Sequence, residues 1–278
     1  MKIALAQYDI VWEDKKRNML LIKDYINKAG QEGAELICLP EMSLTGFSMN
    51  AEKTGEVEAD SETIQFFLRA AEEYQIKIGF GMVTKSGSNS SDMLQTSSKK
   101  ALNKYFIVNE SGEILLNYEK IHPFTYSEES KFFDGGEKIV SCNLNGIEVS
   151  AFICYDLRFP EIFQIASRKA DLILVPANWP ETRILHYDTL LRARAIENQC
   201  YVAGINRVGS GDGLTYTGGS VIYDPYGVNV SEFVPVLSEN DGLLMAEIHS
   251  DIVKDYRDTF PVKKDRKEDL YEKLRGMF

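Results

Sequence analysis

Apolar residues along the chain follow two patterns, one typical of strands and one typical of helices. Short apolar runs bounded by turn residues predict buried strands at residues 2–8, 35–41, 76–83, 102–108, 114–118, 149–153, 171–176, 201–205 and 243–248. Apolar residues three and four positions apart predict amphipathic helices at residues 18–29, 61–74, 161–169 and 186–198, and a last one from about residue 250. Helices and strands alternate throughout, which indicates a layered α/β architecture with mixed sheets.

The segments between these elements are interpreted as turns and loops. Residues 85–98 are rich in Ser, Gly and Asn, which predicts an exposed hairpin or loop. Residues 125–136 have the composition of a mobile segment, and residues 219–230 that of a hairpin. Residues 209–213 are glycine-rich but lack the lysine of a phosphate-binding loop, which favours a flexible turn. Because no linker or internal repeat interrupts the pattern, we expect one domain over residues 1–278.

Composition and charge narrow the class of partner. Of the 278 residues, 44% are hydrophobic and 26% are charged, as in an ordinary globular protein. The formal net charge is 31 − 42 = −11, which argues against a nucleic-acid partner or an anionic membrane surface. No window of the sequence approaches the apolar length of a membrane span. A small molecule is the expected partner.

Cysteine and histidine usage argues against disulfides and metal sites. The four cysteines, Cys38, Cys142, Cys154 and Cys200, show no CxxC spacing, and no signal peptide precedes the first predicted strand. We therefore expect a reduced, cytoplasmic protein. The chain has only three histidines, far apart and without a zinc-binding spacing. We expect no metal and no cofactor.

Residues 149–163 carry the clearest chemical signal. The apolar run ends at Cys154, a polar turn follows, and Pro160 and Glu161 are suited to the first turn of a helix. A cysteine at such a turn has its sulfur at the sheet edge beside backbone N–H groups, as a nucleophile requires. The alternative is that Cys154 is one more buried apolar side chain, as most free cysteines are.

Two further strand ends carry complementary side chains. Glu41 and Lys120 each lie at or just past the carboxyl end of a predicted strand, where catalytic groups gather in α/β folds. Taken singly, either residue is explained as a solvated loop residue. Together with Cys154 they supply a base, an electrostatic stabiliser and a nucleophile. Pairing of Cys154 with His122 or His186 is a weaker alternative, because neither histidine has an evident Asn or Asp to orient it.

Three sequence blocks resemble the signatures of the nitrilase, or carbon–nitrogen hydrolase, superfamily. They are Leu39-Pro40-Glu41, Tyr118-Glu119-Lys120-Ile121-His122 and Cys154-Tyr155-Asp156-Leu157-Arg158-Phe159-Pro160-Glu161. The resemblance implies a four-layer α-β-β-α sandwich, and a Glu-Lys-Cys triad at Glu41, Lys120 and Cys154. It also implies a second catalytic glutamate, for which Glu129 has the best spacing and Glu128 remains the alternative. It further implies a homodimer, with the tail from about residue 260 as a candidate for dimer contacts.

Three segments outside the signature blocks most resemble the ω-amidase branch of the family. Members of this branch hydrolyse the terminal amide of 2-oxoglutaramate and 2-oxosuccinamate. These segments are residues 178–183, 191–199 and 206–209. The expected activity is hydrolysis of a small ω-amide to acid and ammonia through a cysteine thioester. Two alternatives stay open: another branch of the family, such as a carbamoyl-amide hydrolase or a nitrilase, and a non-catalytic binding protein on the same fold.

Substrate contacts are expected around the three strand ends. The substrate-binding candidates are Tyr155 through its backbone N–H, and Tyr126, Arg158, Asn178 and Trp179. A 2-oxo-ω-amide carries a carboxylate, so binding needs local positive charge in a protein of net charge −11. The candidate arginines for that carboxylate are Arg158, Arg183 and Arg207. Arg158 has a structural alternative, an ion pair with Asp156 or Glu161.

Overall fold

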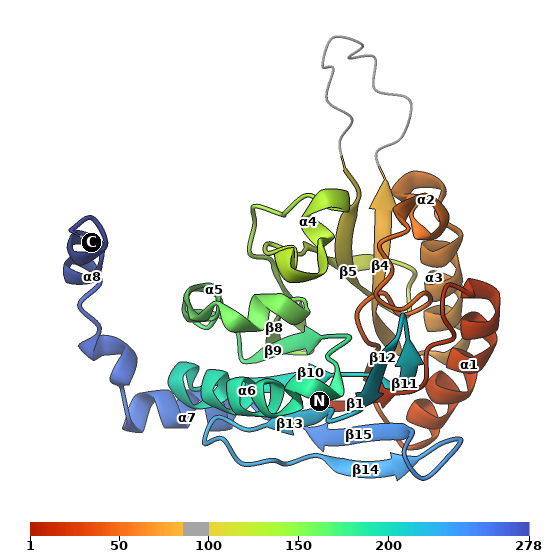
Figure 1. The fold of residues 1–278 in the computed structure, drawn as a ribbon. Coiled ribbons are helices and arrows are strands. Elements are labelled where there is room, and N and C mark those ends of the chain that lie inside the picture. The colour runs from red at the N-terminus through yellow and green to blue at the C-terminus, as the bar shows by residue number, and fades with distance from the viewer. Residues whose placement is uncertain (86–99, 278) are drawn as a thin grey trace.

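Two packed sheets lie at the centre of the fold, and helices cover the outer face of each (Figure 1). The computed structural model describes residues 1–85 and 100–277. Within these ranges the larger sheet has eight strands and the smaller sheet five. The expected four-layer α-β-β-α sandwich with mixed sheets is confirmed. Of the loop expected at 85–98, all but the first residue lies outside the described residues.

The larger sheet is parallel at its centre and antiparallel toward both edges. β1, β2 and β4 run parallel, whereas β15 and β14 on one side and β5 and β6 on the other are antiparallel to their neighbours. The strands in spatial order are β14 (Glu232–Pro235), β15 (Gly242–Glu247), β1 (Lys2–Gln7), β2 (Leu36–Cys38), β4 (Lys77–Lys85), β5 (Leu102–Val108) and β6 (Ile114–Glu119), and β3 (Glu56–Val57) also pairs with β4.

The smaller sheet has a parallel centre of three strands that are buried on both faces. Every residue of β9 and β10 is buried, as expected for parallel strands covered on both sides. Its strands in spatial order are β13 (Val221–Tyr223), β10 (Tyr201–Ile205), β9 (Leu172–Pro176), β8 (Ile147–Ala151) and β7 (Ser141–Leu144).

Alternation along β1 shows how the layers separate. Ile3 and Leu5 belong to the apolar cluster between the two sheets. Ala4 and Ala6 belong to the cluster between the larger sheet and its helices. Successive side chains of a strand point to opposite faces, so one strand supplies both clusters. The helices of the outer layers are α1 (Lys15–Gln31) and α3 (Glu62–Tyr74) on the larger sheet, and α5 (Pro160–Ala166) and α6 (Ile184–Asn198) on the smaller.

Some local predictions were wrong. Residues 209–213 are not a flexible turn but part of a hairpin of β11 (Val208–Gly211) and β12 (Leu214–Thr217), with Asp212 and Gly213 at positive φ in its turn. The helix expected from about residue 250 is present as α7 (Ser250–Thr259), but it is not the last, because a 3₁₀ turn (Val262–Asp265) and α8 (Glu268–Arg275) follow it. Pro261 explains the break, since proline cannot continue a helix that needs its N–H. The edge strands β7 and β14 were not predicted.

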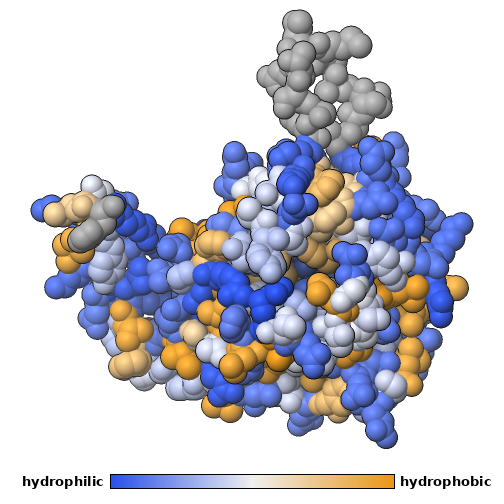
Figure 2. All heavy atoms as spheres, in the orientation of Figure 1, coloured by the Kyte–Doolittle hydropathy of each residue, from blue (hydrophilic) through white to orange (hydrophobic). Residues whose placement is uncertain are grey.

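The end of the tail projects from the layered body as an arm (Figures 1 and 2), while Lys263 and Arg266 at its base donate hydrogen bonds to Ser167 and Gln164. α8 leaves apolar side chains partly exposed, among them Leu270, Tyr271 and Leu274. The homodimer with contacts in this tail stays a prediction, as does a cytoplasmic location. In the part of the chain that the structure describes, no helix combines the length and the apolar character needed to cross a bilayer.

Glu56 anchors the start of α3 and makes stability depend on pH. Its carboxylate accepts hydrogen bonds from Lys15, Ser61 and Thr63. Burial alone would raise the pKa of Glu56, but these donors outweigh it and lower the pKa from 4.5 to about 2. A carboxyl with a lowered folded-state pKa stabilises the fold above its unfolded pKa, and this contribution is lost as the pH falls toward 2.

We expect Glu56→Gln to lower the free energy of unfolding by about 3 kcal/mol at pH 7, because a shift of that size corresponds to roughly this energy. The difference from the wild type should narrow below pH 4.5 as Glu56 takes up its proton. Urea unfolding at several pH values measures this difference in the free energy of unfolding. Glu52→Gln is the control, because Glu52 is exposed. Equal stability of Glu56→Gln and wild type at pH 7 would contradict this account.

Candidate active site

The Cys154 turn joins the end of β8 to α5. A short 3₁₀ helix (Cys154–Arg158) follows the strand, and α5 begins at Pro160. Cys154 itself has φ = 47°, in the left-handed region that non-glycine residues rarely occupy. Its side chain is partly exposed and lines a cavity of about 170 Å³. The structure therefore presents the thiol at the sheet edge, as the sequence predicts for a nucleophile.

Glu41 lies three residues beyond β2 and is completely buried. A glycine in the neighbouring strand makes room for its loop, since a Cβ at Gly81 would lie 2.5 Å from the backbone N of Met42. The Oε1 atom of Glu41 accepts from Asn103 Nδ2 at 2.8 Å and from Lys120 Nζ at 3.0 Å. Its Oε2 atom accepts from the backbone N–H of Asn178 at 3.1 Å. The carboxylate is thus held on both oxygens.

Lys120 and Glu129 complete a buried charge cluster. Lys120 follows β6, and its Nζ lies 2.8 Å from Glu129 Oε2 and 3.0 Å from Glu41 Oε1. Glu129 is completely buried and also accepts the backbone N–H of Phe124 at 2.5 Å. The structure thereby separates the two candidate glutamates. Glu129 joins the cluster, whereas the exposed Glu128 pairs with Lys131.

The segment 125–136, predicted to be mobile, is instead anchored by Glu129. It forms a 3₁₀ turn (Thr125–Ser127) and the short helix α4 (Glu129–Phe132). Glu128, at φ = 63°, directs the chain into α4. The polar composition of this segment is typical of a solvated, mobile loop. One of its polar side chains, Glu129, is instead buried and pairs with Lys120.

Asn103 is a member of the cluster that sequence reasoning missed. It lies in β5, is almost completely buried, and its Nδ2 atom bridges the carboxylates of Glu41 and Glu129 at 2.8 and 3.1 Å. Its backbone carbonyl accepts the N–H of Lys120 at 2.9 Å. An asparagine inside an apolar strand was the signal available, since a buried amide needs partners.

Electrostatics of the cluster keep the lysine charged and the thiol neutral. Burial alone would lower the pKa of Lys120, but the carboxylates of Glu129 and Glu41 outweigh it and raise that pKa. Burial raises the pKa of the Cys154 thiol well above its usual range, and Glu41 adds to this effect while Lys120 opposes it. A neutral thiol is a weak nucleophile, so attack requires a base to take its proton.

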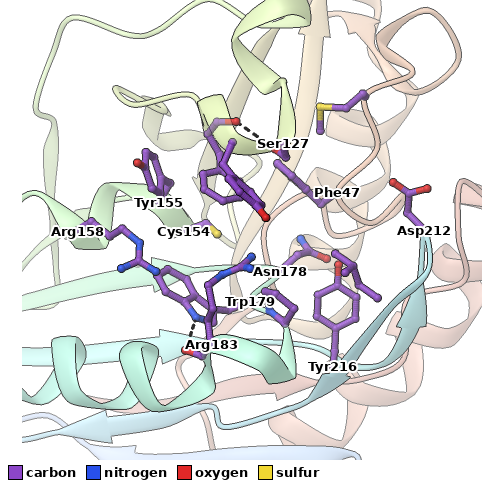
Figure 3. A pocket seen from close by; sticks show the side chains of 15 residues that line it. Phe47, Ser127, Cys154, Tyr155, Arg158, Asn178, Trp179, Arg183, Asp212 and Tyr216 are labelled. Atoms are coloured by element: carbon purple, nitrogen blue, oxygen red, sulfur yellow. Dashed lines mark hydrogen bonds between the residues drawn. The ribbon is translucent and has the colours of Figure 1, made fainter.

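All of the predicted substrate-binding residues line the cavity above the cluster (Figure 3). Tyr155 and Arg158 come from the Cys154 turn, and Asn178 and Trp179 follow β9. Tyr126, from the anchored segment, is exposed at the cavity. The further lining residues are mainly apolar: Phe47, Met49, Phe124, Pro180, Leu214 and Tyr216, together with Ser127, Arg183 and Asp212.

Two of the three candidate arginines face the cavity, and the third does not. Arg158 lies 4.9 Å from the ring centroid of Trp179, and its Nη2 atom is 3.3 Å from His186 Nδ1. Its expected alternative was an ion pair with Asp156 or Glu161; the hydrogen bond observed is to His186. Arg183 lies over Phe124.

The prediction for Arg207 was wrong. Its side chain is completely buried, pairs with Asp9 and donates to the backbone carbonyls of Ile10, Val208 and Ser210. It also lies 4.6 Å from the ring centroid of Tyr216, which lines the cavity. Because the side chain is completely buried and does not line the cavity, it supports the cavity wall and does not face a ligand there.

The placement of the histidines does not favour the alternative of a cysteine–histidine pair. Contrary to the expectation from the sequence, His122 does have an aspartate partner, Asp156, whereas His186 is bonded to Arg158. Neither ring lines the cavity at Cys154, and within the described residues neither forms a hydrogen bond with the thiol. Within residues 1–85 and 100–277, no three His, Cys, Asp or Glu side chains are grouped as metal ligands would be. Around Cys154 the structure places the carboxylates of Glu41 and Glu129, the ammonium of Lys120 and the backbone N–H of Asn178.

Comparisons with known proteins agree with this geometry. The family described as carbon-nitrogen hydrolase matches residues 2–258. The 2-oxoglutaramate amidase of Bacillus subtilis is 31% identical, over 97% of this chain and 98% of its own length. The omega-amidase YafV of Escherichia coli is 33% identical, over 96% of this chain and 97% of its own.

A solved structure extends the agreement to the fold. XC1258 from Xanthomonas campestris, a CN-hydrolase superfamily protein with an arsenic adduct in the active site, superimposes with a TM-score of 0.80. It is 27% identical, and the match covers 96% of this chain and 97% of that one. The family resemblance seen in three sequence blocks is confirmed.

The neighbouring glutamates provide a matched pair for testing the cluster. Glu129→Gln keeps the size of the side chain but removes a charge that faces Lys120, so we expect the turnover rate per folded molecule to fall about 100-fold, or ~3 kcal/mol. Glu128→Gln, at an exposed position, should stay within about twofold of the wild type. Steady-state kinetics on enzyme of verified fold measure both. Equal losses, or a greater loss at residue 128, would contradict the assignment.

Proposed function

The chain belongs to the carbon–nitrogen hydrolase family and is an amidase, and from this premise we propose that it hydrolyses the terminal amide of a small 2-oxo acid. 2-Oxoglutaramate and 2-oxosuccinamate are the expected substrates, and the products are the dicarboxylic acid and ammonia. The observation that carries the proposal is the buried Glu41–Lys120–Glu129 cluster beside a partly exposed Cys154. The names of the two curated relatives support the choice of substrate. Membership of this enzyme class decides against the non-catalytic binding protein.

Acylation begins with the neutral thiol. Glu41 takes the proton as Cys154 Sγ attacks the amide carbon, and negative charge develops on the former carbonyl oxygen. The Lys120 ammonium and the backbone N–H of Tyr155 stabilise that oxygen, a contribution typically worth about 3–4 kcal/mol per donor. The C–N bond then breaks as Glu41 returns the proton to the leaving nitrogen. Ammonia departs and the acyl group remains on Cys154 as a thioester.

Deacylation uses the same groups in a second cycle. Water takes the place of ammonia, Glu41 accepts its proton, and the hydroxyl attacks the thioester carbon. The C–S bond breaks, the proton passes to the sulfur, and the acid leaves. In this scheme Glu129 does not meet the substrate. It acts by holding Lys120 in place and charged, at 2.8 Å from the ammonium.

Substrate recognition is assigned to Arg158. Its guanidinium is held between Trp179 and His186 at the cavity wall, and it belongs to the same turn as Cys154. A planar guanidinium binds a carboxylate through two parallel hydrogen bonds. It supplies local positive charge in a protein whose net charge is −11. Arg183, over Phe124, is the second candidate.

The substrate is tested by ammonia release from a panel of amides, carbamoyl amines and nitriles. We expect 2-oxoglutaramate to exceed a neutral amide of similar length by about tenfold or more in kcat/KM. Arg158→Met should raise KM for 2-oxoglutaramate by about 10- to 100-fold, the range for a lost hydrogen-bonded charge pair, with little change for the neutral amide.

Arg168→Met is the matched control, because Arg168 is exposed and pairs with Glu268 away from the cavity. It should leave both parameters unchanged. A wild-type preference for neutral amides, carbamoyl amines or nitriles would refute the substrate while leaving the amidase class intact. An unchanged KM in Arg158→Met, with a raised KM in Arg183→Met, would move the carboxylate site to Arg183.

A further inference from the structure

A further buried carboxylate, besides Glu41 and Glu129, lies two residues after Cys154. Asp156 is completely buried, and its two oxygens accept four hydrogen bonds. Oδ2 accepts from the backbone N–H of Ile153 at 2.9 Å and from the hydroxyl of Tyr118 at 2.8 Å. Oδ1 accepts from His122 twice, from the backbone N–H at 3.0 Å and from the ring Nδ1 at 2.8 Å. Because a carboxylate oxygen accepts, Nδ1 carries the hydrogen.

These four bonds connect the two chain segments that carry the reacting groups. Ile153 directly precedes Cys154, whereas Tyr118 and His122 lie on either side of Lys120 along the chain. Burial, together with the neighbouring Asp156, raises the pKa of Tyr118 well above its usual range, so its hydroxyl keeps the hydrogen that it donates. Asp156 therefore fixes the Cys154 turn against the strand end of Lys120.

The partly exposed ring of His122 makes a further contact with the Cys154 turn. Its ring is stacked on Phe159 at a centroid distance of 3.7 Å and an interplanar angle of 13°. Phe159 directly follows the turn that Cys154 begins, so the ring contacts this segment at two points, the middle of the turn by the hydrogen bond to Asp156 and its end by stacking on Phe159. The turn needs such support, because Cys154 is held at a positive φ that the backbone avoids by itself.

We propose that the His122–Asp156 pair is a positioning unit, which holds Cys154 in its left-handed turn at the correct place relative to Lys120. Neither residue takes part in the reaction in this proposal. The pair lies outside the lining of the substrate cavity, so its loss should lower kcat and leave KM nearly unchanged. The proposal rests on the proposed function for the role of Cys154, and it does not depend on the identity of the substrate.

Two substitutions separate the contributions of His122. His122→Phe keeps an aromatic ring to stack on Phe159 but removes the Nδ1–H donor. His122→Asn places an N–H at the position of Nδ1 but removes the ring. We expect His122→Phe to lower kcat about tenfold with KM within about twofold. His122→Asn should keep kcat per folded molecule within about threefold of the wild type, although its melting temperature falls.

Glu56→Gln serves as the control for lost stability, since its partners are Lys15, Ser61 and Thr63. It should unfold more easily and yet keep the wild-type kcat. The proposal is overturned if His122→Phe keeps full kcat, or if His122→Asn loses as much kcat as His122→Phe. If the wild type hydrolyses no amide, the proposed function alone fails. In that case crystal structures of both variants test the proposal. The proposal is supported if the φ angle of Cys154 leaves the positive region only in His122→Phe. It is refuted if this angle is unchanged in both variants.

Discussion

One ammonium group shared by two buried carboxylates is the interaction on which this site depends. Isolated charges in a protein interior are strongly unfavourable, and a buried ion pair is tolerated only when further hydrogen bonds satisfy it. Here Glu41 and Glu129 share Lys120, and Asn103 donates to both carboxylates. Backbone amides of Asn178 and Phe124 occupy further acceptor positions. The cluster therefore draws together β2, β5, β6, α4 and the segment after β9.

The same cluster explains why Cys154, the proposed nucleophile, carries a neutral thiol. Two carboxylates and one ammonium leave the site with one excess negative charge, which disfavours a thiolate beside it. Burial acts in the same direction, and both raise the pKa of Cys154. A neutral thiol limits unwanted alkylation and oxidation, since the thiolate is the reactive form. In the proposed mechanism its activation is coupled to the presence of an electrophile, because Glu41 takes the proton only as Sγ attacks.

The sequence predicted the parts of this site that follow strand ends. Glu41, Lys120 and Cys154 each follow an apolar run, and the carboxyl ends of such strands meet at one edge of a sheet. Three other features were beyond pattern reasoning. Glu129 was expected only from the family resemblance, because the polar composition of its segment does not show that it is buried against Lys120. Asn103, an asparagine inside an apolar strand, indicates that a buried amide needs partners but does not identify them. Arg207 was a candidate for ligand binding because it follows a strand end. The sequence does not show that backbone carbonyl groups occupy its side chain in the fold.

The central claim is that Cys154 carries the acyl group, and mass spectrometry of the intact protein tests it directly. Wild-type enzyme is mixed with its best amide substrate, quenched in acid within the first turnovers, and weighed. The account predicts an added mass equal to the amide less ammonia, located on Cys154 by peptide mapping and absent in Cys154→Ala. The same adduct should appear in variants that lack Cys38, Cys142 or Cys200. Full turnover by Cys154→Ala, or an acyl group on any other residue, would contradict the account.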